Sequence, residues 1–282
     1  MKTTLEQFGF TATINHHGAE LVSLRKNNTE YIWEGNPEFW GKHSPVLFPI
    51  VGTLKENTYR HGGKQYHLPR HGFARDRVFE LVSKTDATAV FSIASDPQTM
   101  AVYPFGFELQ IIYTLTHQGL TIGYLVCNRS DETMPFAIGA HPAFALPGNF
   151  EDYHLEFEKN ETPVYHLLEN DLISNRTASL VLDNQKLPLD YALFANDALV
   201  FKKLESKSLT ICKDDAPLLT VAFAGFPNLG LWTKPGAPFL CIEPWFSYAD
   251  TPESNGELSQ KEGILSLAPH GNFETKFSIT IR

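Results

Sequence analysis

The sequence predicts one large all-β protein with stacked antiparallel sheets, and three observations favour this fold class. Apolar residues recur at every second position along most of the chain, which is the period of a strand with one buried face. No stretch of twelve residues or more has the period of an amphipathic helix. The 19 glycines and 18 prolines are spread along the chain, as turns between many strands require.

No composition break or low-complexity linker divides the 282 residues, so we expect a single domain over residues 1–282. Sheets of this size must stack or close to hide their faces and edges. Alternation predicts three hairpins and a final strand: residues 79–83 with 89–93, residues 107–115 with 120–126, residues 200–204 with 208–212, and the strand 277–281. Asn36 as a cap and Pro37 at the first helical position predict one short helical turn.

Composition excludes several classes of partner. The net charge is -9 and no run of Lys or Arg stands out, so nucleic acid is not an expected partner. The three cysteines have no C-x-x-C spacing, which argues against disulfides and zinc knuckles and favours buried thiols. The N-terminus lacks an apolar signal segment and no window reaches membrane-spanning length, so we expect a cytoplasmic protein without a membrane partner.

Two proton-handling residues each stand directly before a proline, in His141-Pro142 and Glu243-Pro244. Proline holds the preceding residue in an extended conformation and removes a backbone donor. The ordinary pKa of histidine suits general acid or base catalysis, and desolvation of Glu243 after its apolar strand should raise its pKa. The structural alternatives are a hydrogen-bonded core histidine and a buried salt bridge between Glu243 and an arginine.

Other residues suit ligand binding. His71 precedes a glycine and lies between Arg70 and Arg75, whose guanidinium groups bind hydroxyls, carboxylates or phosphates. A basic turn between strands is the alternative reading of this segment. Asp197 begins an apolar strand, where it would bind hydroxyls or cap a turn. The chain has no H-E-x-x-H, H-x-H, P-loop or dinucleotide motif, so we expect neither a metal nor a cofactor.

In the order and spacing of these motifs the chain resembles the aldose 1-epimerase (galactose mutarotase-like) family, and its LacX-like branch close to hexose-6-phosphate mutarotases. The matching segments lie across nearly the whole sequence: Leu21–Leu24, Tyr31–Trp33, Pro45–Gly52, His71–Arg75, His141–Phe144 and Glu243–Trp245. The resemblance implies a β-supersandwich with a sugar-binding cleft across a concave sheet. It also implies an isomerase that interconverts the α and β anomers of an aldose, with no cofactor.

The resemblance assigns roles to individual residues. Glu243 falls where the family's base takes the C1 hydroxyl proton, and His141 where its acid protonates the ring oxygen. His71 and Asp197 match residues that hold hydroxyl groups. The aromatic residues that we expect against the apolar side of a sugar are Trp232, Trp245 and Phe144.

The chain departs from the family at one place. Galactose mutarotases have an Asn-Arg pair shortly after the strand that Gly52 ends, and residues 53–59 here contain no arginine. Either Arg75 or Lys55 takes that role, or the substrate differs from free galactose; Arg70 with Arg75 would suit a sugar phosphate. The expected partner is therefore a sugar or sugar phosphate, and exposed edge strands make a homodimer possible. A non-catalytic sugar-binding or sensory protein and a glycoside hydrolase using Glu243 with Asp197 are the alternatives.

Overall fold

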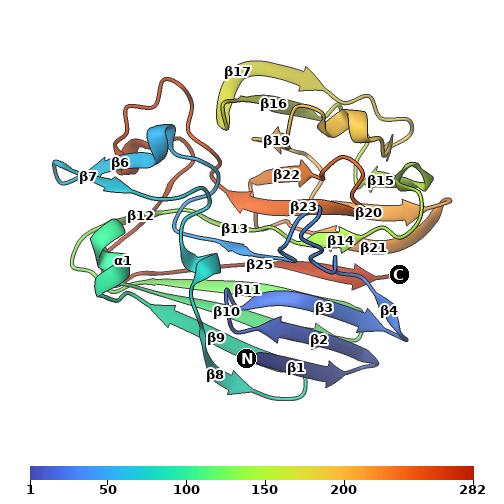
Figure 1. Ribbon diagram of the computed structural model, residues 1–282, viewed down its shortest axis with the longest axis horizontal. Helices are drawn as coiled ribbons and strands as arrows, with labels where there is room; N and C mark the ends of the chain where they lie inside the picture. Colours follow the sequence, from blue (N-terminus) through green and yellow to red (C-terminus); the bar gives the residue numbers. More distant parts are fainter.

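Two long antiparallel sheets make up most of this all-β protein, whose computed structural model describes residues 1–282 (Figure 1). Nine strands form the longer sheet, in the order β18 (Lys186–Pro188), β15 (Tyr153–Phe157), β20 (Ser208–Lys213), β21 (Ala216–Ala222), β25 (Asn272–Ile281), β11 (Gly119–Asn128), β10 (Phe107–Thr116), β9 (Thr88–Ala94) and β8 (Glu80–Lys84). The other sheet has the order β17 (Leu172–Ser179), β16 (Val164–Glu169), β19 (Leu199–Phe201), β22 (Asn228–Trp232), β23 (Phe239–Phe246), β13 (Ile138–Ala140) and β5 (Val46–Leu47), with β14 (Ala143–Ala145) also paired to β23.

Smaller elements complete the fold. A four-stranded N-terminal sheet has the order β1 (Lys2–Gln7), β2 (Phe10–Asn15), β3 (Glu20–Lys26) and β4 (Thr29–Glu30). Two two-stranded ribbons are formed by β6 (Thr58–His61) with β7 (Lys64–His67), and by β12 (Met134–Phe136) with β24 (Leu265–Leu267). The helices are α1 (Pro97–Val102) and five short 3-10 turns: Lys55–Asn57, Ala74–Asp76, Phe150–Asp152, Tyr191–Phe194 and Leu258–Gln260. None of these helices has the length and apolar character that crossing a bilayer would need.

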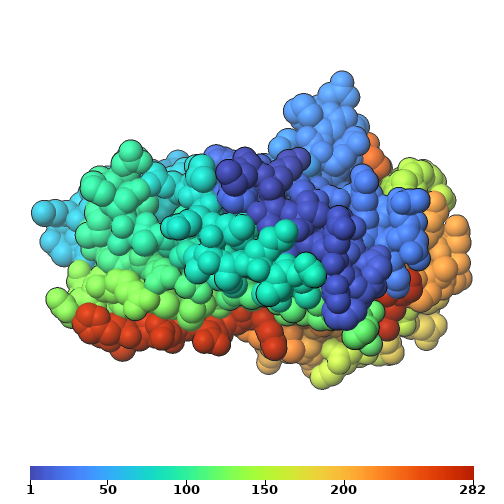
Figure 2. Space-filling model, turned by 90° about the horizontal axis from the view of Figure 1, so that it is seen from below, coloured from blue at the N-terminus to red at the C-terminus, as the bar shows by residue number.

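The alternating pattern produces the core directly. Along β10 buried and partly exposed side chains alternate over all ten residues, so one face of the strand is apolar. One cluster of 60 buried residues takes side chains from both long sheets, including Leu209 of β20, Ile279 of β25 and Ile242 of β23. The N-terminal sheet joins the same core, and the Tyr113 hydroxyl donates to the Ala19 carbonyl at 2.6 Å. Figure 2 shows these blue N-terminal strands beside the teal and green strands, with red C-terminal residues along one edge.

Two of the three expected hairpins are confirmed. Residues 107–116 pair with 119–128 as β10 and β11, and residues 80–84 pair with 88–94 as β8 and β9. The third is wrong, because β19 pairs with β16 and β22 whereas β20 pairs with β15 and β21 in the other sheet. The connection between β19 and β20 therefore leads from one sheet to the other and is not a hairpin turn. The Glu161 carboxylate accepts the backbone N–H groups of Glu205 and Ser206 in this connection.

The short helical turn expected after Asn36 is confirmed. The Asn36 side chain accepts the Glu38 backbone N–H at 3.0 Å, and its carbonyl accepts the Trp40 backbone N–H at 2.9 Å, as in a single turn of helix. Helix α1 was not expected. Asp96 forms a capping box with Thr99 and Pro97 occupies the first turn, which is a local signal readable in the sequence.

Candidate active site

A cleft of about 520 Å³ opens over β22, β23 and the segment between β13 and β14. Eight of the nine residues that the sequence singled out for binding or catalysis line it: Arg70, His71, Arg75, His141, Asp197, Trp232, Glu243 and Trp245. They come from five separate stretches of the chain, so the fold gathers them from up to 175 residues apart, the separation of Arg70 and Trp245 (245 minus 70). Sequence reasoning missed the lining residues Trp40 and Lys234.

Strand alternation places Glu243 at the floor of the cleft. In β23, Leu240 and Ile242 belong to the large core cluster, so Glu243 points to the opposite face. Gly230 of β22 is its direct cross-strand neighbour and has no side chain to cover the carboxylate. A Cβ on Gly230 would lie 2.5 Å from the ring of Trp245, so this glycine also makes room for the indole.

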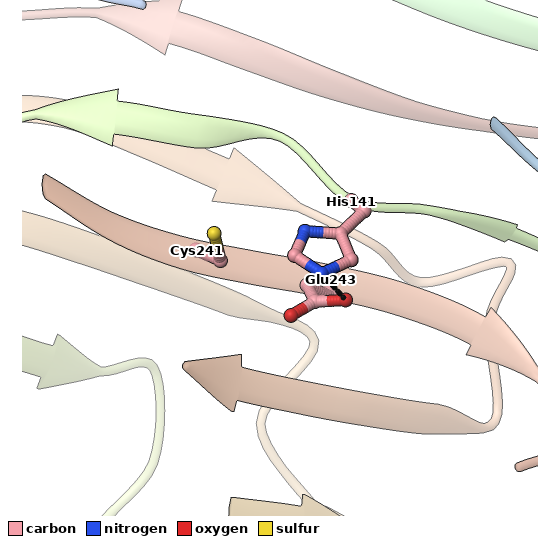
Figure 3. Close-up of side chains that lie close together, drawn as sticks. All are labelled: His141, Cys241 and Glu243. Carbon is pink, nitrogen blue, oxygen red and sulfur yellow. Dashed lines mark ion pairs between the residues drawn. The ribbon is translucent and has the colours of Figure 1, made fainter. Parts of the chain in front are cut away.

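The Nε2 atom of His141 and the Oε2 atom of Glu243 lie 3.3 Å apart, as Figure 3 shows. His141 stands between β13 and β14, and its backbone N–H is held by the Pro45 carbonyl at 3.1 Å. The side chain of Glu243 is 1% exposed and that of His141 is 10% exposed. Glu243 Oε2 and His141 Nδ1 have no hydrogen-bond partner, so both atoms are free to form a hydrogen bond with a ligand.

Burial disfavours charge on each member of this pair. It raises the pKa of Glu243 well above its ordinary value and lowers the pKa of His141 to about 3. The expected direction for Glu243 is thus confirmed. The structure therefore favours an uncharged carboxyl group beside a neutral imidazole, with Nε2 and Oε2 3.3 Å apart.

His71 lies at the side of this pair, with its ring centroid 5.8 Å from that of His141. Its backbone has a φ of +68°, and a Cβ on the following Gly72 would lie 2.2 Å from the Phe48 carbonyl oxygen. Only glycine fits there, so Gly72 fixes the turn that directs His71 into the cleft. The backbone N–H of Gly52 donates to Nδ1 at 3.1 Å, and burial lowers the pKa of His71 well below its ordinary value. Burial therefore favours a neutral His71 imidazole, and Arg70 Nε donates to its Nε2 at 3.3 Å.

The cleft also carries fixed charges. Arg70 contacts Asp171 at 3.0 Å and Asp197 at 3.8 Å, and Arg75 donates to the Arg70 carbonyl at 2.9 Å. The Nε atom of Arg75 is buried without a hydrogen-bond partner, and burial lowers the pKa of this arginine. Asp197, at a φ of +78°, accepts the backbone N–H of Ala198 at 2.7 Å. It thus both caps a turn and presents its remaining oxygen to the cleft.

Aromatic rings enclose the imidazole of His141. Trp40 stacks on it with a centroid distance of 4.7 Å and an angle of 25°, and Trp232 meets it edge-on at 5.8 Å. Lys234 holds the Trp40 loop in place, since its Nζ donates to the carbonyls of Glu38 and Phe39 at 3.2 and 3.1 Å. No motif marks Trp40 in the sequence; its one signal is the Asn36-Pro37 turn before it.

Phe144 is a correction to the sequence analysis. It has no exposed surface, belongs to the large core cluster and does not line the cleft. The reason is the alternation in β14: Ala143 joins the cluster around Cys241, so the next side chain must point into the core. The two candidates for the absent family arginine are also separated, because Lys55 Nζ donates to the Pro252 carbonyl outside the cleft whereas Arg75 lines it.

One sulfur atom lies beside His141 and Glu243. The Cys241 thiol, the His141 ring and the Glu243 carboxylate have donor atoms within 4.8 Å of one another (Figure 3). Burial raises the pKa of the Cys241 thiol well above its ordinary value, so the sulfur is a neutral S–H group. Because Arg70 and Arg75 line the same cleft, the local charge opposes a divalent cation there and suits a sugar or an anion.

Comparisons with known proteins agree with this geometry. The sequence model for the family "Aldose 1-epimerase" matches residues 1–266, and the chain belongs to this family. A curated relative, the chromosomal protein LacX of Lactococcus lactis subsp. lactis, is 34% identical over 94% of each chain. The resemblance to the LacX-like branch is thereby confirmed.

Solved structures show the same fold. A galactose mutarotase related enzyme from Lactobacillus acidophilus superimposes with a TM-score of 0.94 at 35% identity, covering 100% of this chain and 97% of the other. A galactose mutarotase-like protein from Lactobacillus casei ATCC 334 gives a TM-score of 0.94 at 30% identity, covering all of both chains. The fold is therefore the galactose mutarotase-like β-supersandwich that the resemblance implied.

Proposed function

We propose that the protein is a cofactor-independent aldose 1-epimerase that interconverts the α and β anomers of a hexose or hexose phosphate. The observation that carries this proposal is the buried pair of His141 and Glu243, 3.3 Å apart at the floor of an open cleft. Family membership supports a sugar epimerase in general. The substrate and the roles of individual residues are our inference from the geometry.

The proposed reaction moves two protons and makes no covalent intermediate with the protein. The Glu243 carboxylate takes the proton of the C1 hydroxyl while His141 gives a proton to the ring oxygen. The C1–O5 bond breaks and leaves an open-chain aldehyde. Rotation about C1–C2 presents the other face of the carbonyl, and the reverse transfers close the ring. A positioned acid and a positioned base each contribute roughly 10²–10⁴-fold to such a reaction.

The surrounding residues would hold the sugar. We assign hydroxyl binding to the neutral ring of His71 and to Asp197, whose carboxylate accepts. Trp232 and Trp245 would face the apolar side of the ring. Arg70 and Arg75 would bind the most polar end of the substrate, and a phosphate group suits them best because the bidentate guanidinium matches its oxygens.

We also propose that residues 1–282 act as one aldose 1-epimerase-like domain. The supporting observation is that a single buried cluster extends from Leu5 to Ile281 and includes residues of both long sheets. The cleft draws its residues from positions 40 to 245, so most of the chain is needed to build it.

A polarimetric assay tests the proposed reaction. Fresh α-glucose, α-galactose and glucose 6-phosphate would be followed with and without protein, and we expect faster decay of rotation for at least one of them. Glu243→Gln should reduce the catalysed rate by roughly 10²–10⁴-fold, because it removes the base but keeps the shape. Glu80→Gln, the same change at an exposed residue of β8, is the matched control.

Two outcomes would contradict the proposal. Full activity in the Glu243→Gln variant would mean that another group is the base. Calorimetric binding of a hexose without faster mutarotation would instead identify a sugar-binding or sensory protein, and release of reducing sugar from an oligosaccharide would identify a glycosidase.

A further inference from the structure

A second group of donor atoms lies on the nine-stranded sheet, outside the cleft. His154 of β15 and Cys212 of β20 are direct cross-strand partners, and Glu156 follows two residues after His154 on the same face. One donor atom from each of the three residues lies within 4.8 Å of the other two. The sheet itself therefore sets their spacing, because paired and alternate positions share one face.

The donors of this group are not used elsewhere. The Nε2 atom of His154 is buried and has no hydrogen-bond partner. The Cys212 residue is 1% exposed, and its only polar contact is a weak one, from Sγ to Glu156 Oε2 at 3.9 Å. A buried nitrogen without a partner costs about 1–3 kcal/mol, so a ligand that satisfies it would stabilise the fold.

The donor types select the kind of ligand. An imidazole nitrogen, a thiol sulfur and a carboxylate oxygen form the mixed set that binds zinc, whereas Mg²⁺ and Ca²⁺ prefer oxygen alone. Three protein donors leave the fourth tetrahedral position to water. Glu156 is exposed, so a cation has a route from solvent to the buried sulfur.

The charges around this group are mixed. The carboxylates of Glu156 and Asp215 act on the Cys212 thiol, and Lys186, the cross-strand neighbour of Glu156, pairs with Asp215 at 2.5 Å. In the cleft, by contrast, Arg70 and Arg75 oppose a divalent cation beside Cys241. The two groups have the same three donor types and differ in their electrostatic surroundings.

We propose that His154, Glu156 and Cys212 form a binding site for Zn²⁺ or another thiophilic divalent cation. Binding replaces the S–H bond of Cys212 with a metal–sulfur bond, and the proton passes to the buffer. The cation would join two neighbouring strands close to the sheet edge that β18 forms. It would therefore stabilise this part of the protein independently of the sugar cleft.

Cobalt replaces zinc as the probe, because thiolate ligation of Co²⁺ gives an intense near-ultraviolet absorption band. Full-length protein would be titrated with Co²⁺, and we expect the band to saturate at one ion per chain. Cys212→Ser should abolish the band, and Glu156→Gln should weaken binding while the exposed position preserves folding. Cys241→Ser, which changes the matching thiol in the cleft, should leave the band intact.

Thermal unfolding gives a second readout. Zn²⁺ should raise the Tm of the unmodified protein in proportion to the logarithm of its free concentration, and this shift should vanish in Cys212→Ser. Absence of the cobalt band, or loss of it in Cys241→Ser but not in Cys212→Ser, would overturn the proposal. Both readouts are independent of catalysis, so failure of the proposed epimerase activity would not affect them.

Discussion

Glu243 is a carboxyl group held in a place that disfavours its charge. Its folded-state pKa is raised by burial, so between its ordinary pKa and the raised value the folded state binds more protons than the unfolded state. The free energy of unfolding must then fall as pH rises through this window. We expect Glu243→Gln to be more stable than the unmodified protein at neutral pH, by roughly 1–3 kcal/mol, the usual cost of a buried unsatisfied group.

Urea unfolding at several pH values measures this difference. The gain from Glu243→Gln should shrink toward acid pH, where the carboxyl group is protonated in both states. The exposed control Glu80→Gln should show no such trend. A variant whose destabilisation grows as pH rises would mean that the carboxylate is stabilised by its surroundings.

The pH dependence of the activity should also reflect the pair of His141 and Glu243. The proposed mechanism needs one shared proton on His141 and Glu243, so the rate should fall when a second proton is added and when the last one is lost. Burial opposes a second proton through the lowered pKa of His141, and it retains the first through the raised pKa of Glu243. We expect a bell-shaped dependence of kcat/KM on pH for the favoured hexose.

The fall of kcat/KM at alkaline pH should result from loss of the proton that His141 and Glu243 share. Replacing His141 by Asn should remove the bell shape together with most of the activity, because the remaining carboxyl group has no partner to exchange with. Retention of the same two limbs in that variant would contradict the assignment to the pair.

At the scale of elements, one glycine of β22 helps to position the site. Gly230 lies across from Glu243, and a Cβ there would meet the Trp245 ring at 2.5 Å. Overpacking of this kind costs about 1–3 kcal/mol and shifts the neighbouring side chains. We therefore expect Gly230→Ala to lower both Tm and kcat/KM. Gly123→Ala is the matched control in β11, because its Cβ would have only ordinary contacts, the nearest at 3.7 Å.

Comparing the two variants separates an effect on the candidate site from the general effect of an added Cβ on a strand. Gly123→Ala should leave activity unchanged and keep or raise the Tm, since the added methyl group makes only ordinary van der Waals contacts with Ile112. Equal losses in both variants would show that the strands tolerate no added Cβ anywhere, and that Gly230 has no special role.

The sequence predicts strands better than it predicts their partners. Alternation identified the strand around 208–212 correctly, but it contains no information about whether β20 pairs with the preceding strand β19 or lies in the other sheet. The connection between β19 and β20 is bound by the carboxylate of Glu161, more than forty residues away in sequence. Short-range patterns cannot report such a contact.

The candidate site was predictable where a residue's chemistry is unusual for its surroundings. Glu243 after an apolar strand and His141 before a proline both satisfy that condition, and both line the cleft. Trp40 and Phe144 do not, because a tryptophan in a loop and a phenylalanine in a strand are ordinary residues. Which of them reaches the cleft depends on the face of β14 and on the course of the 36–44 loop, and three-dimensional packing decides both.

At the scale of the whole molecule, both long sheets end in edge strands. Strands β8 and β18 end the nine-stranded sheet, and β17 ends the other. Unpaired edges can join copies of a chain, so the homodimer stays a prediction, as does the cytoplasmic location. Sedimentation of the purified protein over a range of concentrations would measure the association directly.

The cations that line the cleft predict how the activity depends on salt. The chain carries a net charge of -9, yet Arg70, Arg75 and Lys234 line the cleft. At physiological salt the Debye length is about 8 Å, so a bound phosphate senses these cations more than the dispersed acidic surface. We expect kcat/KM for glucose 6-phosphate to fall as NaCl is raised, and that for glucose to stay nearly constant. Arg75→Gln should reduce the salt dependence, whereas Arg25→Gln, at an exposed arginine outside the cleft, should preserve it. If both sugars respond equally to salt, these cations bind hydroxyl groups and the substrate is not a phosphate.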